Sequence, residues 1–191
     1  MKYIAKHIAF ALSVSLSAAT ATAEGHFEGR VEVGGVPIAT AKVSLWSAGT
    51  GAPQSLATAT TAEDGSYALT IADGNVDSSV LYLIAEGGTA KGTPSKTPNS
   101  ATTLMATLGA KLPERVIINE LTTVASVWTA AQFLDGTAMS GNVTGLKIAA
   151  GNVPNLVDLE TGGLGPVIID PLNAPETTVL GKFNTLGLLL S

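Results

Sequence analysis

Hydrophobic and polar residues alternate along much of the first half of the chain. In "FEGRVEV", the positions Phe27, Gly29, Val31 and Val33 alternate with charged residues. A period of two residues with charges on one side predicts a half-buried strand. Further runs of this kind follow at intervals of roughly ten residues, separated by turn-forming residues; they are "AKVSLWS", "SLATATT", "SYALTI", "VLYLIAEG" and "TTLMATLG". This spacing predicts an antiparallel β-sandwich over residues 24–111, in which "VLYLIAEG" is a central strand.

A helical period replaces the alternation in residues 112–191. In "NELTTVASVWTAAQFL", apolar residues recur at helical spacing from Leu121 to Ala131, and Asn119 is a suitable N-cap. The segment "MSGNVTGLKIAAGNVPNLVD" predicts one or two short helices, broken at Gly151 and Pro154. The chain is therefore expected to be α+β and mainly β, with a sandwich followed by a small helical region.

A last helix is predicted in "NAPETTVLGKFNTLGLLLS". Asn173 is its N-cap candidate, and Glu176 three residues later completes a capping box. The apolar stripe predicted for this helix consists of Val179, Phe183, Leu186 and Leu190.

The helix predicted near Leu121 has no charged residue between Leu121 and Leu134. A surface helix normally carries charges on its solvent face. This helix is therefore expected to be covered, by the rest of the chain or by a partner, with Trp128 in the core.

The N-terminal segment "MKYIAKHIAFALSVSLSAATATA" has the composition of a secretory signal peptide. Lys2 and Lys6 precede an apolar stretch at residues 8–19, and an A-x-A pattern ends at Ala23. We expect residues 1–23 to be removed and the protein to be exported to the periplasm or beyond the cell, without a membrane span in the mature form. An uncleaved anchor is the alternative.

Charge narrows the range of partners. The chain has ten basic and 15 acidic residues, for a net charge of −5, and removal of Lys2 and Lys6 makes it more negative. An acidic surface repels phosphate groups, so nucleic acid and anionic lipid are not expected partners. The chain has no cysteine, so packing has to stabilise it without disulfides.

Two adjacent acids stand before a glycine at Glu63, Asp64 and Gly65. Asp-Gly between two alternating runs predicts a β-hairpin turn, because glycine adopts positive φ without steric cost. The alternative is weak calcium binding by Asp64 with Asp73 or Asp77, although an EF-hand loop requires more acids than this segment has.

The first strands resemble the carboxypeptidase regulatory-like family, which has a transthyretin-like β-sandwich. The resemblance rests on a G-x-V opening, a Gly-x-Pro turn-strand and an acidic-Gly-x-aromatic hairpin; the fitting residues are Gly29, Val31, Gly35, Pro37, Ile38, Ala41, Val43, Asp64, Gly65 and Tyr67. It implies an accessory fold without catalytic residues of its own.

The helical half is similar to a region that follows such sandwiches in exported bacterial proteins of unassigned role. Some of those proteins continue into NHL-type β-propellers. The similarity rests on "INELTTVASVWTAAQF", "AAGNVPNLVDLETGGLG" and "PLNAPETTVLGKFNTLGLLL". This chain departs from those proteins by stopping soon after "FNTL", which raises the expectation of a shortened relative or a fragment.

Motifs for catalysis are not found in the sequence. After removal of the signal peptide one histidine, His26, remains, and there is no H-E-x-x-H, G-x-S-x-G or G-K-[ST] motif. We expect no cofactor and no resident metal. A carboxylate pair is the remaining route to hydrolysis; its candidates are Asp64, Asp73, Asp77, Asp158 and Asp170.

These observations predict a non-catalytic exported module with an accessory or structural role, able to self-associate through its helical half. A carbohydrate- or peptide-binding module at the cell surface is the alternative, with a protein or glycan as partner. Its ligand would contact Trp46, which shares a strand face with Lys42 and Ser44, and the polar loop Gly87–Ser100. A carboxylate-dependent hydrolase is the remote alternative.

Overall fold

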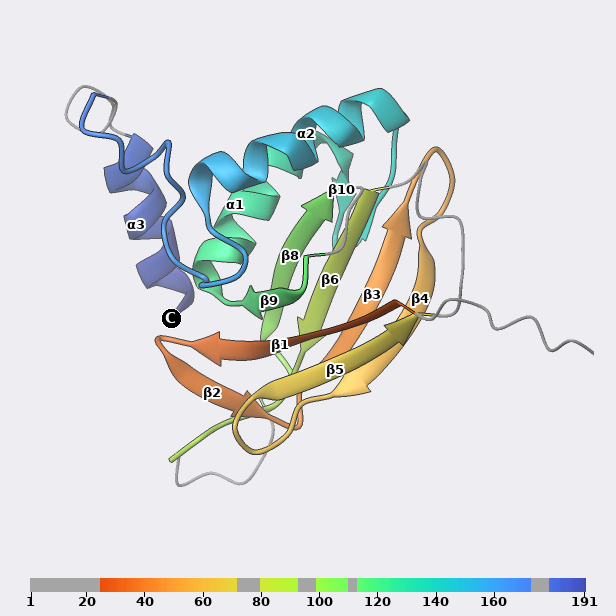
Figure 1. Ribbon diagram of the computed structural model, residues 1–191, viewed down its shortest axis with the longest axis vertical. Coiled ribbons are helices and arrows are strands. Elements are labelled where there is room, and N and C mark those ends of the chain that lie inside the picture. The colour runs from red at the N-terminus through yellow and green to blue at the C-terminus, as the bar shows by residue number, and fades with distance from the viewer. Residues whose placement is uncertain (1–24, 72–79, 93–98, 110–112, 173–178) are drawn as a thin grey trace, which may run out of the picture.

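The computed structural model describes residues 25–71, 80–92, 99–109, 113–172 and 179–191. Within them, antiparallel sheets combine with helices packed on one side, which confirms the expected mainly-β α+β class (Figure 1). Two predicted features lie outside the described residues: the signal peptide with its cleavage after Ala23, and the capping box of Asn173 and Glu176.

The first sheet, sheet I, is organised around β1. Strand β1 pairs antiparallel with β5 on one side and with β2 near its end, and it pairs parallel with β9. The strands of sheet I are β5 (Ser66–Ile71), β1 (Gly25–Val33), β2 (Val36–Ala39), β7 (Thr89–Ala90) and β9 (Arg115–Ile118).

The second sheet, sheet II, is fully antiparallel. Its strands, in spatial order, are β4 (Gln54–Thr60), β3 (Lys42–Ala48), β6 (Val80–Glu86) and β8 (Thr103–Gly109). The predicted central strand is therefore confirmed as β6, which lies between β3 and β8.

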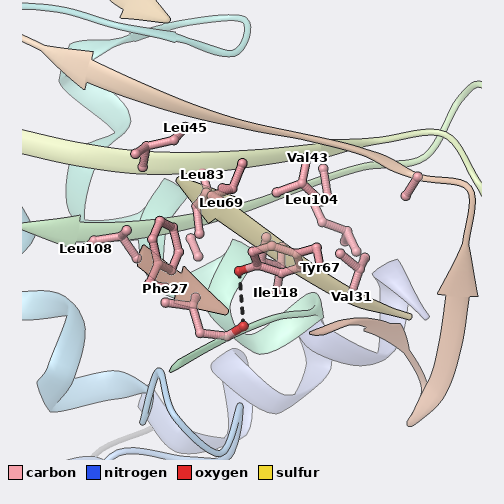
Figure 2. Close-up of a cluster of buried hydrophobic side chains, with 14 of the residues drawn as sticks. Phe27, Val31, Val43, Leu45, Tyr67, Leu69, Leu83, Leu104, Leu108 and Ile118 are labelled. Atoms are coloured by element: carbon pink, nitrogen blue, oxygen red, sulfur yellow. Dashed lines mark hydrogen bonds between the residues drawn. The ribbon is translucent and has the colours of Figure 1, made fainter. Parts of the chain in front are cut away.

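Sheets I and II share one apolar core, and the alternation in the sequence supplies it. Phe27 and Val31 of β1 are buried, whereas Glu28 and Arg30 between them are exposed. Tyr67, Leu69 and Ile71 of β5 belong to the same core, in which Tyr67 and Leu69 lie opposite Leu45 and Leu83 of sheet II (Figure 2). The outer face of sheet I keeps its charged side chains in solvent, as expected for an antiparallel sheet with one covered face.

Strand β9 lies in the region that the sequence assigned to helices. Its residues Val116 and Ile118 are fully buried in the core shared by the two sheets. The helical half thus contributes a strand to sheet I, and its first residues are held by β1. A four-residue strand is too short for its period to be recognised beside a long helical pattern.

The outer face of sheet II is covered by the helical half. Tyr82 and Ile84 of β6 belong to a second apolar cluster, to which helix α2 (Val143–Leu156) contributes Leu146 and Ala150. Strand β6 is consequently buried on both faces. The covering elements also include the 3₁₀ helix η1 (Ala131–Phe133) and the short hairpin of β10 (Leu134–Asp135) and β11 (Ala138–Met139).

Three α-helices complete the described structure: α1 (Glu120–Ala130), α2 (Val143–Leu156) and α3 (Val179–Leu190). The predicted N-cap of α1 is confirmed, because Asn119 Oδ1 accepts a hydrogen bond from the N–H of Thr122 at 3.0 Å. The hydroxyl of Thr122 accepts in turn from the Asn119 N–H at 2.9 Å, which completes a capping box.

The prediction that Gly151 and Pro154 break α2 is wrong. The helix continues through both residues to Leu156. Pro154 lies in its last turn, where the missing N–H removes only one helical hydrogen bond. Val153 and Val157, on either side of the proline, are fully buried and hold this end of α2 in the core.

Helix α1 lies along the outer edge of β8, and its side chains bond to that edge. The hydroxyl oxygen of Thr123 accepts from the N–H of Met105 at 2.9 Å, and that of Ser126 accepts from the N–H of Thr107 at 2.8 Å. These N–H groups have no neighbouring strand, and unpaired buried N–H groups are costly. The polar residues of the uncharged helix therefore replace a missing strand, and the prediction that α1 is covered is confirmed for this face.

Removing either hydroxyl is expected to destabilise the protein. Thr123→Val and Ser126→Ala each leave a buried β8 N–H without an acceptor, which costs about 1–3 kcal/mol. Urea unfolding measures this loss. Thr129→Val is the matched control, because the Thr129 hydroxyl bonds only within α1, to Ala125 C=O at 2.9 Å. A loss no larger in Thr123→Val than in the control would contradict the account.

Replacing the hydroxyl of Thr107 is expected to stabilise the protein rather than destabilise it. Among the described side chains it is the buried oxygen without a hydrogen-bond partner, and Thr107 is 1% exposed. Thr107→Val replaces this hydroxyl by a methyl group and keeps the backbone N–H that donates a hydrogen bond to the Ser126 hydroxyl oxygen. We expect a gain in unfolding free energy of up to about 1 kcal/mol, measured in urea. Destabilisation would show that the hydroxyl has a partner.

Candidate functional site

The Glu63-Asp64-Gly65 segment forms a turn. The Asp64 carboxylate accepts from the Ser66 hydroxyl at 2.6 Å and from the Ser66 N–H at 3.0 Å. These two bonds lower the pKa of Asp64, and nearby Arg30 adds a smaller effect of the same sign. Asp64 is therefore ionised at neutral pH and is committed to its own turn, so it is poorly suited to act as a general acid.

The turn does not close a hairpin, and this part of the prediction is wrong. Strand β4 before it pairs with β3 in sheet II, whereas β5 after it pairs with β1 in sheet I. The segment is a corner between the two sheets. Buried Thr61 anchors it, because its hydroxyl donates to Ile38 C=O at 2.7 Å and accepts from Ala41 N–H at 2.9 Å.

Two other residues of the family-like motif, Gly29 and Tyr67, make a close contact inside the core. The Tyr67 hydroxyl donates to Val116 C=O at 3.1 Å, and burial raises the pKa of this phenol. A Cβ at position 29 would lie 2.0 Å from the same Val116 oxygen. Gly29 and Tyr67 thus hold β9 against β1, and their role is structural.

A polar hollow of about 630 Å³ lies over the outer face of sheet I, beside the Asp64 turn. Its charged residues are Glu28, Arg30, Asp64 and Arg115. Arg115 and Glu28 form an ion pair at 3.0 Å, and both side chains are more than half exposed. The hollow has both signs of charge and hydroxyl groups from Thr60 and Ser66, so it can accept a polar ligand.

Among the described acids proposed as catalytic residues, Asp158 and Asp170 do not line this hollow. Asp73 and Asp77 lie outside the described residues. Asp158 Oδ1 accepts from the Glu160 N–H at 2.9 Å, and Asp170 Oδ1 accepts from the Leu172 N–H at 2.8 Å. Across the described ranges, no group of three or more histidine, aspartate or glutamate side chains is placed to hold a metal ion.

Trp46 is half-buried rather than displayed on an open face. It packs against the cluster on the outer side of sheet II, together with Phe133 and Leu134. Ser44, on the same face of β3, is 2% exposed. A ligand at Trp46 would therefore reach only its rim.

Trp128 is not in the core, and this prediction is wrong. It is 42% exposed and lines an apolar groove of about 310 Å³ between α1 and α3. The groove exists because Phe183 and Gly187 are the residues of α3 that are buried against the rest of the protein. Leu186 lies beside this packing contact and stays exposed. Of the predicted stripe of α3, Phe183 is buried and Val179 is partly buried against the same cluster. Leu186 and Leu190 are instead 41% and 48% exposed, since Gly187 takes the next buried position. The lining residues are Thr123, Val124, Val127, Trp128, Leu186, Leu189 and Leu190.

Glu120 has a role that sequence reasoning missed. It is 7% exposed at the start of α1, and its carboxylate accepts a hydrogen bond from the N–H of Gly34 in the turn between β1 and β2. The negative charge of Glu120 also interacts favourably with the positive, N-terminal end of the α1 dipole. Its position beside an N-cap was visible in the sequence, but its partner, 86 residues away, was not.

Comparison of the chain with protein-family models, curated proteins and solved structures found no match. The likeness to the carboxypeptidase regulatory-like family therefore remains a prediction from the motif residues. Among the described residues, no helix has the length and hydrophobicity needed to cross a bilayer.

Gly65 tests the structural account of the turn. Its φ is +78°, and an added Cβ would lie 2.6 Å from the Val31 carbonyl oxygen. We expect Gly65→Ala to lower the unfolding free energy by about 2 kcal/mol or more. Gly51→Ala is the control, since that site is open and its φ is not positive. Equal melting temperatures for the two variants would contradict this assignment.

Proposed function

We propose that this chain is a non-catalytic exported module that acts through its surfaces, on a scaffold like that of the carboxypeptidase regulatory-like sandwiches. The observation that carries the proposal is that three aspartates bond to the backbone of their own turns. Asp64, Asp158 and Asp170 each accept the backbone N–H of the residue two positions later. A carboxylate used in this way shapes a turn, as Asx motifs do. Three separate turns supply no acid–base pair.

The polar groups of the core support the same proposal. The hydroxyls of Thr123 and Ser126 bond to β8, the phenol of Tyr67 bonds to β9, and the carboxylate of Glu120 bonds to the β1–β2 turn. Each connects two elements of the fold. Buried polar groups with such partners stabilise structure rather than react with a substrate.

A carbohydrate- or peptide-binding module is the second candidate. The hollow on sheet I favours it over the surface at Trp46, because Arg30 and Arg115 border an open volume of about 630 Å³ there. Arginine can donate two parallel hydrogen bonds to a carboxylate, which suits an acidic peptide or an acidic sugar. Loss of binding in Arg30→Gln, with no change in melting temperature, would support this candidate.

Conservative removal of the carboxylates tests the main proposal. Asp64→Asn, Asp158→Asn and Asp170→Asn keep an oxygen that accepts the same N–H, so the fold is retained while the acid is lost. We expect no turnover by the wild-type protein or by any variant on fluorogenic glycosidase, esterase, phosphatase and peptidase substrates. Turnover that one asparagine variant abolishes, at an unchanged melting temperature, would show that the protein is an enzyme.

A further inference from the structure

We infer that the apolar groove between α1 and α3 binds the same groove of a second copy of this chain, across a two-fold axis. The inference deepens the proposed function, on which it rests, by naming the partner of the helical face.

The exposed apolar area suits the centre of a dimer interface. Five large side chains line the groove with exposed fractions of 41% to 76%; they are Val127, Trp128, Leu186, Leu189 and Leu190. Their exposed fractions correspond to about two and a half fully exposed side chains. At roughly 200 Å² each, the exposed area is on the order of 500 Å². A patch of this size is at the upper end for a monomer, and a standard interface buries about 800 Å² per partner. The groove can therefore supply the apolar centre of such an interface.

Charge restricts the contact between two copies to this face. The chain carries 15 acids and a net charge of −5, so two copies repel over most of their surfaces. None of the groove residues is charged. The charged residues of the two helices are Glu120, which is buried and bonded to Gly34, and Lys182 on α3. Two copies can therefore approach through this face without placing acids opposite each other.

Shape also favours a symmetric contact. Leu189 is 76% exposed and stands at the rim, whereas Val124 is 6% exposed and forms the floor. The same surface thus has a projecting side chain and a recess of about 310 Å³. An isologous interface requires this self-complementarity, in which Leu189 of each copy enters the recess of the other. Trp128 beside the recess is the residue type most enriched at energetic centres of interfaces.

Sedimentation equilibrium of the purified protein, with the N-terminus that the producing cell leaves, tests the inference. Over about 1 to 100 µM we expect a reversible monomer–dimer equilibrium. Leu189→Asp should raise the dissociation constant at least tenfold, because it places two like charges in an apolar contact. Ile148→Asp on α2 is the matched control: it is 64% exposed and outside the groove, and should leave the constant unchanged.

Fluorescence of Trp128 in a Trp46→Phe background gives a second measurement. Its emission should shift to shorter wavelength as the concentration rises, and Leu189→Asp should abolish this shift. A monomeric mass over the whole range, growth beyond the dimer, or equal effects of the two aspartate variants would overturn the inference. Enzymatic turnover would instead overturn the proposed function and leave the measured mass unchanged, so the two failures are distinguishable.

Discussion

The hydrogen bonds from β8 to α1 determine how the two halves of this protein fit together. An edge strand exposes N–H groups that must be hydrated, paired or covered. Here Thr123 and Ser126 accept from Met105 and Thr107, so a helix closes the sheet where another strand would otherwise be needed. Once α1 is fixed there, α2 can cover the outer side of β6 and α3 can pack against α1. The arrangement gives β6 of sheet II two buried faces and leaves β1 of sheet I with one.

The same constraint explains the composition of α1 and the distribution of charge. The faces of α1 that meet the strand edge and the other helices have no place for charged residues, and its exposed residues Val127 and Trp128 line the groove. The acids are found instead at corners and on the outer face of sheet I, as at Asp64 and Glu28. The chain therefore carries charged residues on the outer face of sheet I and none among the residues that line the groove between α1 and α3.

The sequence pattern predicted the features that depend on residues close together in the chain. The alternation around Phe27 and Tyr67 placed the core correctly, and the N-cap at Asn119 marked the start of α1. The turn at Asp64 was also predictable, because its hydrogen bonds span two residues. Its strands, however, belong to different sheets, and turn chemistry does not specify long-range pairing. Trp128 was misplaced for a similar reason: periodicity shows which residues share a helix face, but not that glycine in α3 takes the position against α1.

Native-state hydrogen exchange of the β8 amides tests the central claim most directly. The N–H groups of Met105 and Thr107 lie on the edge strand of sheet II, yet each has a buried side-chain acceptor. They should exchange as slowly as the amide of Leu83 in the interior strand β6, at the rate of global unfolding. Thr58 of β4, at the opposite and uncovered end of the sheet, should exchange much faster. Fast exchange at Met105 and Thr107, comparable to that of Thr58, would contradict the account.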